Sequence, residues 1–143
     1  MKYPRIKQKY SCGPAAVRFC LLHLLDVGVS EEGLMKQMKT DKNGMTTLPF
    51  RLMKCLRTHG LQVRGYHDMS IKSLKKHLLK GRLVITPFWD HYYIVLVVDG
   101  EEITFFCPLQ NRLKMSIDEF ERRWIDKDST GKIYNNYGIV VKK

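Results

Sequence analysis

Long apolar segments are missing from this sequence. Its most apolar stretch, from Ala15 to Leu25, is interrupted by Arg18 and His23. It falls well short of the roughly 20 residues that a membrane-spanning helix needs. The basic residues at the N-terminus are not followed directly by the apolar core of a cleaved secretion signal. These absences predict a cytoplasmic protein without a membrane span.

Closely spaced cysteine pairs are missing as well. The four cysteines are Cys12, Cys20, Cys55 and Cys107, and none forms the C-x-x-C pair of a zinc ribbon or finger. Without a secretion signal we expect free thiols rather than disulfides. The five histidines are dispersed, and no ligand pair has helical spacing with a supporting carboxylate. The sequence therefore predicts neither a metal nor another cofactor.

Acidic residues are few compared with basic ones. There are 14 Asp and Glu against 25 Lys and Arg, which gives a formal net charge of +11. Such a charge attracts acidic partners, among them nucleic acid, an anionic membrane surface and an acidic polypeptide, but it does not choose among them. The remaining composition, 44% hydrophobic and 27% charged, is that of a globular protein and excludes a disordered or collagen-like chain.

Basic residues concentrate between residues 51 and 82, where the only acid is Asp68. The nine cations of this segment are Arg51, Lys54, Arg57, Arg64, Lys72, Lys75, Lys76, Lys80 and Arg82. Two interpretations stay open: the solvated faces of two helices, or a contact surface for an acidic protein substrate or a phosphate backbone. Nucleic-acid binding usually also places exposed aromatic residues among the charges, and the tyrosines here lie mostly in strand-like runs.

The length of the chain suits one domain, residues 1–143. Its first half predicts four helices from their cap residues. They run from Ser11-Cys12-Gly13-Pro14 to about Asp26, from Ser30 onward, from a cap at Thr46 or Thr47 to His59-Gly60, and from Ile71 to Lys80 after a cap at Ser70. The first of them is apolar almost all round, which indicates a central helix.

The second half predicts strands, because its β-branched and aromatic runs are typical of them. These runs are residues 82–88, 92–98, 103–107 and 137–141, after a short earlier run at 61–66 and beside a helix near 116–124. Asp99-Gly100 predicts a hairpin turn. Apolar residues at helical spacing around that last helix predict core positions: Met115, Ile117, Phe120 and Trp124. Helices first and antiparallel strands afterwards indicate an α+β fold, a helical half packed against a sheet half.

Cys12 is the most informative position for chemistry. It lies where the first helix begins, and the unpaired backbone N–H groups there favour a thiolate. Gly13 leaves space beside the sulfur and Pro14 starts the helix. Gln8, four residues upstream, could donate a hydrogen bond to an oxyanion together with the Cys12 backbone N–H.

A nucleophilic cysteine needs a base, and His91 is the candidate. It stands at the start of a strand, where an imidazole can face a helix N-terminus and accept the thiol proton. The other four histidines have structural explanations. They lie on the central helix (His23), at a helix end (His59), in a loop (His67) and on a basic helix (His77).

The segments Gln8 to Ala16 (QKYSCGPAA) and His91 to Gly100 (HYYIVLVVDG) together resemble the papain-like double-glycine peptidases that process bacteriocin leaders, and their stand-alone relatives. The resemblance continues through Gly44-Met45-Thr46, Gly60-Leu61 and the Asp118-Glu119-Phe120 segment with Trp124, so it covers nearly the whole chain. It implies a papain-like fold in which a central helix carries the cysteine and packs on an antiparallel sheet.

The resemblance implies a cysteine peptidase with Cys12 as nucleophile, His91 as general base and Gln8 as oxyanion donor. It also implies an Asp before a Pro on the strand after the hairpin, where this sequence has Cys107-Pro108. A neutral thiol is a weak acceptor, so Asn111, Gln110 or a backbone carbonyl are alternative partners that could orient His91.

Hairpin geometry leaves the position of Cys107 open. With Asp99 and Gly100 alone as the loop, His91 falls opposite Pro108, and Cys107 faces the other side of the sheet. A loop that also includes Glu101 shifts the register by one residue and brings Cys107 onto the His91 face.

The sequence thus predicts a cysteine peptidase, or a related thiol acyl-transfer enzyme such as an amidase, deamidase or isopeptidase, acting on a peptide or protein. Two alternatives remain. One is a catalytically degenerate peptidase-like domain that binds a leader peptide or partner protein. The other is a basic nucleic-acid-binding domain.

Overall fold

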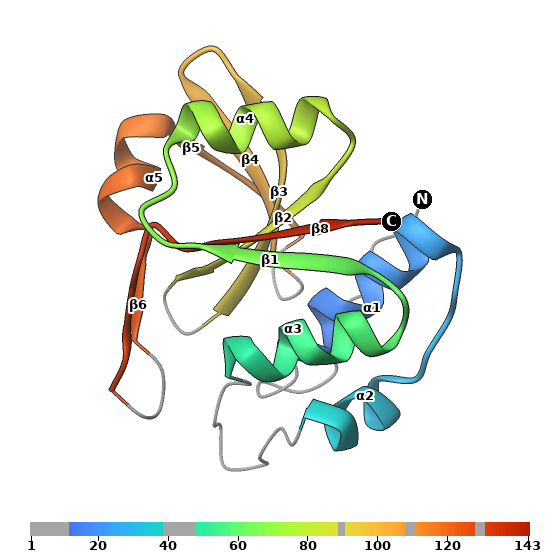
Figure 1. Ribbon diagram of the computed structural model, residues 1–143. Helices are drawn as coiled ribbons and strands as arrows, with labels where there is room; N and C mark the ends of the chain where they lie inside the picture. Colours follow the sequence, from blue (N-terminus) through green and yellow to red (C-terminus); the bar gives the residue numbers. More distant parts are fainter. Residues whose placement is uncertain (1–11, 39–47, 89–90, 108–110, 128–130) are drawn as a thin grey trace.

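The computed structural model describes residues 12–38, 48–88, 91–107, 111–127 and 131–143 (Figure 1). The helices are α1 (Cys12–Leu25), α2 (Glu31–Met38), α3 (Pro49–Thr58), α4 (Ile71–Leu79) and α5 (Ile117–Arg123). The strands are β1 (Gln62–Tyr66), β2 (Leu83–Phe88), β3 (His91–Asp99), β4 (Glu102–Cys107), β5 (Asn111–Ser116), β6 (Ile125–Lys127), β7 (Ile133–Asn135) and β8 (Gly138–Lys142). Within this part of the chain, none of the helices has the length and apolar character needed to cross a bilayer.

Six strands form one antiparallel sheet in the order β1-β8-β2-β3-β4-β5, and β6 pairs with β7 in a separate hairpin. Figure 1 shows α1, α2 and α3 on one side of the sheet and α4 and α5 on the other. The predicted α+β class is confirmed. Two details differ from a simple division into halves, because β1 joins the sheet beside the last strand and α4 lies on the face opposite to α1.

The first hydrophobic cluster lies between α1, α2, α3 and the sheet. The apolar body of α1 supplies much of it: Ala16, Val17, Phe19, Cys20 and Leu21 are buried. The Phe19 ring packs on Phe106 of β4 with 5.4 Å between centroids. The prediction of a central first helix is therefore confirmed, and the helix is held against the middle of the sheet by aromatic contact.

The second cluster lies on the opposite face, under α4 and α5. A chain of ring contacts crosses it from Tyr93 through Phe105 and Phe120 to Trp124, with centroids 5.1 to 5.6 Å apart. The buried Trp124 indole donates a hydrogen bond to the Tyr137 carbonyl at 3.0 Å, so it leaves no unpaired donor in the core. The prediction that Phe120 and Trp124 are core residues is confirmed.

Serine side chains mark three helix starts. In each case the hydroxyl accepts a hydrogen bond at 3.1 Å from the backbone N–H three residues on, and the three are Ser30, Ser70 and Ser116. The predicted cap of α3 is wrong. Leu48 holds the N-cap position without a side-chain bond, because Pro49 at the first helical position has no N–H to satisfy and presets the helical φ.

Three strands go beyond the predicted elements. Residues 111–116 form β5, and the short strands β6 and β7, which follow α5, form a hairpin. Met115, expected at helical spacing with Phe120, lies in β5 instead and packs half-buried on the second cluster. β5 alternates polar and apolar residues, with Leu113 and Met115 facing the cluster and Arg112 and Lys114 exposed, which is the period of a half-buried strand.

Candidate active site

Cys12 is the first residue of α1, as the sequence predicts. The helix that follows is buried from its first turn, with Ala15 and Ala16 almost fully covered. The backbone N–H groups of a first turn have no partner within the helix, and they carry the positive end of its dipole. Cys12 therefore begins α1 at the helix end where the sequence analysis expects the nucleophile. Gln8 lies outside the described residues.

His91 is the first residue of β3 and pairs across the β2–β3 connection with Phe88. Cys107 is the last residue of β4, and Asn111, the first residue of β5, pairs with it directly. Since β3 and β4 run antiparallel, the start of β3 and the end of β4 meet at one end of the sheet. The backbone thus brings three of the predicted site positions, His91, Cys107 and Asn111, to the same sheet end.

The register between β3 and β4 corrects the expected hairpin loop. Asp99 pairs with Glu102, so the loop is Gly100-Glu101 rather than Asp99-Gly100. Gly100 takes φ +59°, which glycine adopts without steric cost. An irregularity between Val95 and Val97 then shifts the pairing by one residue. A β-bulge of this kind places one extra residue on one strand and changes the register beyond it.

Beyond that bulge the pairs are Val95 with Phe105 and Ile94 with Phe106. This is the register that the sequence analysis assigned to a three-residue loop. It arises by a different route, from a two-residue loop plus a bulge. The next pair in the same register would join Cys107 to Tyr93, and Tyr93 is two residues after His91 in β3.

The direction of α1 decides which helix end approaches this sheet end. The last turn of α1 and the C-terminal end of β8 lie on the same side of the molecule in Figure 1. β8 ends level with the start of β2, because Val141 pairs with Leu83. β2 therefore ends, and β3 begins, toward the side on which α1 starts.

Two of the four cysteines, Cys20 and Cys55, are buried, and burial raises the pKa of their thiols. Cys20 is fully buried in α1, and burial raises the pKa of its thiol to about 12. Cys55 of α3 donates to the Gln37 side-chain oxygen at 3.2 Å, and burial raises its pKa to about 11. Because the thiolate is the nucleophile, burial disfavours the reactive form of both groups near neutral pH.

The remaining described histidines have structural partners, as the sequence analysis assigned. His23 stacks on Phe19 with 5.6 Å between ring centroids. His59 shares a 3.0 Å hydrogen bond with Gln37. His67 packs on Tyr137 at 4.6 Å. Among the residues that the structure describes, no group of three or more His, Cys, Asp or Glu side chains could hold a metal ion.

Sequence reasoning missed one arrangement of cations. Arg64, Arg82 and Lys142 come from separate segments and line one groove about 400 Å³ in volume. Sequence spacing could not reveal it, because only the pairing of β1, β8 and β2 brings these residues together.

The comparisons with known proteins agree with this architecture. A model of the peptidase C39 family matches residues 1–127. An uncharacterised protein of Methanothermobacter marburgensis is 32% identical over 115 residues, which cover 79% of this chain and 75% of that protein.

Two solved structures share the fold. The peptidase domain of Streptococcus ComA, a bi-functional ABC transporter involved in quorum sensing, has a TM-score of 0.74 at 18% identity, covering 99% of this chain and all of that one. A double glycine motif protease from an AMS/PCAT transporter, in complex with its leader peptide, has a TM-score of 0.70 at 18% identity, covering 99% of this chain and 91% of that one. The fold implied by the resemblance is confirmed.

Proposed function

The chain belongs to the peptidase C39 family, and on this premise we propose that it is a cysteine peptidase that cleaves a peptide or protein with Cys12 as nucleophile and His91 as general base. Family and fold support a cysteine peptidase in general. We assign the catalytic roles to Cys12 and His91 from the backbone positions at the sheet end described above.

The observation that carries the assignment is the direction of α1 relative to β3. Phe19 contacts Phe106, which is paired with Ile94. From Phe19 back to Cys12 is seven residues of helix, about 10 Å. From Ile94 back to His91 is three residues of strand, also about 10 Å. Both paths lead toward the same end of the sheet, which is the backbone placement that a reaction between the thiol and the imidazole requires.

The reaction proceeds in two steps at this pair. His91 takes the Cys12 proton, and the thiolate sulfur forms a bond to the substrate carbonyl carbon. The carbon–nitrogen bond then breaks, and the His91 imidazolium gives its proton to the leaving amine. A water molecule, deprotonated by His91, hydrolyses the thioester and releases the acid. Gln8 and the Cys12 backbone N–H would stabilise the oxyanion in both steps.

We infer that Asn111 orients His91. An amide oxygen accepts a hydrogen bond from an imidazole N–H, whereas a thiol at Cys107 is a weak acceptor. Asn111 is opposite Cys107 in the β4–β5 pair, so its backbone lies at the sheet end where His91 begins β3. The triad would then be Cys-His-Asn, an arrangement known to support thiol peptidase chemistry.

A peptide is the substrate class that the comparisons favour. The double glycine motif protease among the structural neighbours was solved with a leader peptide bound. By analogy, we propose an extended peptide as the ligand of the sheet end near His91. An unbiased peptide screen identifies the substrate and its cleavage site.

The test is digestion of a peptide library by the full chain, with products identified by mass spectrometry. We expect a defined set of cleavages that Cys12→Ala and His91→Ala each reduce by at least about 10³-fold. His23→Ala is the matched control, because it removes an exposed imidazole from α1. Cleavage that survives in Cys12→Ala would refute the assignment. A wild type that captures peptides without cleaving them would indicate the degenerate binding domain instead.

A further inference from the structure

A basic groove lies on the sheet face that carries α4. It has a volume of about 400 Å³, and its lining residues are Gln62, Val63, Arg64, Tyr66, Arg82, Val140 and Lys142. Three of these are cations and none is acidic. A concave site of this size is in the range of small-ligand pockets.

Strand pairing builds the groove. Gln62 pairs with Lys142, and Arg64 pairs with Val140, so these four residues share one face of β1 and β8. Leu83 pairs with Val141 on the other side of β8, which puts Arg82 one residue further along, level with Lys142. Neighbouring strands are about 4.8 Å apart. The three cations therefore lie within about two strand spacings across the sheet and two residues along the strands.

Contacts between side chains hold two of the cations in place. The Arg64 guanidinium lies over the Tyr66 ring, 5.3 Å from its centroid. Tyr66 in turn packs against His77 of α4 at 5.7 Å. The Arg82 guanidinium donates to Nδ1 of His77 at 3.0 Å, which requires that nitrogen to be unprotonated. The groove is thus an ordered site in which Arg64 and Arg82 are positioned through Tyr66 and His77.

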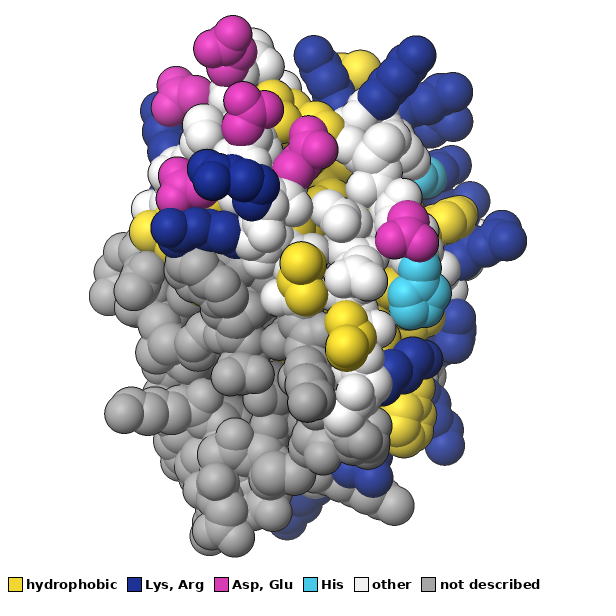
Figure 2. Space-filling model, turned by 90° about the vertical axis from the view of Figure 1, so that its left-hand side faces the viewer, with side chains coloured by type: hydrophobic (Ala, Val, Ile, Leu, Met, Phe, Trp, Pro, Cys, Tyr) yellow, Lys and Arg dark blue, Asp and Glu magenta, His cyan; other side chains and the backbone are white. Residues whose placement is uncertain are grey.

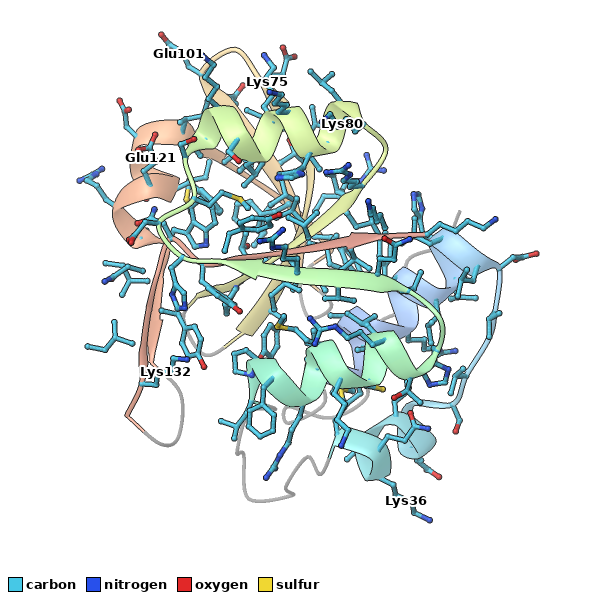
Figure 3. The ribbon with its side chains drawn as sticks, viewed as in Figure 1. Lys36, Lys75, Lys80, Glu101, Glu121 and Lys132 are labelled. Carbon is cyan, nitrogen blue, oxygen red and sulfur yellow. The ribbon has the colours of Figure 1, made fainter. Side chains whose placement is uncertain are left out.

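α4 adds further positive charge at the rim. Lys76 and Lys80 are exposed and close enough, together with Arg82, to lower the pKa of His77 beyond the effect of its burial. Figure 3 shows Lys80 at the end of α4 that leads to β2. Within the described part of the chain, the one ion pair joins Arg123 and Glu119, so none of the groove cations is paired with a described carboxylate.

The charges on the face shown in Figure 2 are unevenly distributed. Lys and Arg side chains line its right-hand margin, whereas most of the visible Asp and Glu side chains lie at the upper left together with a few Lys and Arg. A surface of one sign draws ligands of the opposite sign from solution. The ligand of the groove is therefore an anion.

The groove is too far from the candidate active site to act as an exosite for the same short peptide. β2 leads from Leu83 at the groove to Phe88, the partner of His91, which is about 16 Å along the strand. Arg64 and Lys142 also face the α4 side of the sheet, whereas α1, which begins at Cys12, covers the other side. An acidic tail of a substrate bound at the start of α1 would have to pass around the edge of the sheet.

We propose that the basic groove binds an oligophosphate, either free or as the phosphate chain of a nucleotide. Arginine forks match phosphate oxygens in pairs, and a lysine adds a point charge. Three converging cations suit a ligand with several adjacent negative charges. The faces of Tyr66 are already engaged by Arg64 and His77, so recognition rests on the phosphates and not on stacking of a base.

Calorimetric titration of the full chain tests this at about 0.15 M salt, where weak surface contacts are largely screened. The probes are tripolyphosphate, ATP, adenosine, a single-stranded oligonucleotide and a poly-glutamate peptide. We expect tripolyphosphate and ATP to bind with similar affinity and adenosine not to bind. Binding of the oligonucleotide or of poly-glutamate in the absence of tripolyphosphate binding would overturn the proposal, because it would indicate a macromolecular docking surface.

Paired variants locate the site. Arg64→Gln/Lys142→Gln removes two groove cations, and Lys36→Gln/Lys114→Gln removes two exposed cations elsewhere, on α2 and β5; Figure 3 places Lys36 far from α4. Loss of two charge-assisted contacts predicts at least about tenfold weaker tripolyphosphate binding for the first variant and less than about twofold for the second. Equal weakening in both would refute the groove. Cys12→Ala should bind as the wild type does, so failure here is separate from failure of the peptidase proposal.

Discussion

The two ends of β2 differ in how the sequence builds a site. At the end near His91, the proposed nucleophile and base each begin an element, and a short motif surrounds each of them. At the end near Leu83, the groove cations Arg64, Arg82 and Lys142 come from three segments with no motif. The first kind of site can be predicted from the sequence. The second kind forms only when the register of the paired strands brings distant residues together. The same sheet can thus carry a local, chemical site and a distributed, electrostatic one.

Breaking the packing of α1 should produce the largest effect and should act on the active-site end. Phe19 is fully buried and packs on Phe106. Phe19→Ala should lower the free energy of unfolding by about 3–5 kcal/mol, since it removes an aromatic side chain from the core. Urea denaturation measures this loss. Leu22→Ala, at a half-buried position of the same helix, should cost less, and equal losses would contradict the packing of Phe19.

Substitution of Asn111 tests which residue orients His91 at the active-site end of β2. Asn111→Ala should reduce kcat/KM of peptide cleavage by on the order of 100-fold, because the imidazole loses the group that orients it. Cys107→Asp in the Asn111→Ala background should restore part of the rate, since a carboxylate at the end of β4 can take over the hydrogen bond. If Asn111→Ala has no effect and Cys107→Ala abolishes cleavage, the assignment of Asn111 is wrong. Oligophosphate affinity should stay constant throughout.

Gly65 tests the strand that carries the groove. A β-carbon at this position would overlap the Tyr137 hydroxyl, and that ring is buried and packed against His67 and Tyr134. Gly65→Ala should therefore destabilise the protein by about 1–3 kcal/mol through overpacking. Thermal unfolding measures the change, with Gly28→Ala as the control, because a β-carbon at Gly28 meets nothing within 4 Å. Equal melting temperatures for the two variants would contradict the close packing of β1.

The smallest expected effect is a pH dependence of stability from His77. Its pKa is lowered, first by burial and then by Arg82, Lys80 and Lys76. The unfolded chain therefore binds the proton more readily, so the contribution is present above the ordinary histidine pKa of about 6.5 and is lost as the pH falls below it. His77→Gln should reduce the drop in melting temperature between pH 7.5 and pH 5.5. An unchanged drop would show that protonation of His77 does not contribute to the loss of stability at low pH.

Much of the fold could be predicted because its signals are local. Ser70 and Gly81 bracket α4, and Gly81 takes the positive φ of a helix C-terminus. The central helix follows from its continuous apolar body. β5 was also within reach, because Arg112, Leu113, Lys114 and Met115 alternate in the manner of a half-buried strand.

The rest depends on long-range packing. The bulge between Val95 and Val97 lies in a run of β-branched and aliphatic residues that carries no sign of an irregularity. It nevertheless sets the register at Cys107, so the geometry around the proposed base could not be derived from the turn residues. The groove likewise depends on the pairing of β1 with the last strand, β8, two strands that are far apart in the sequence.

The most direct test of the central claim is the rate of Cys12 alkylation by iodoacetamide as a function of pH, with the modified residue identified by mass spectrometry. Burial holds the thiols of Cys20 and Cys55 at pKa values of about 12 and about 11, so they stay protonated near neutral pH. We predict that Cys12 reacts with an apparent pKa well below the reference of about 8.5, and that His91→Ala abolishes this shift. A Cys12 that titrates as an ordinary thiol, with or without His91, would refute the proposed Cys12–His91 pair.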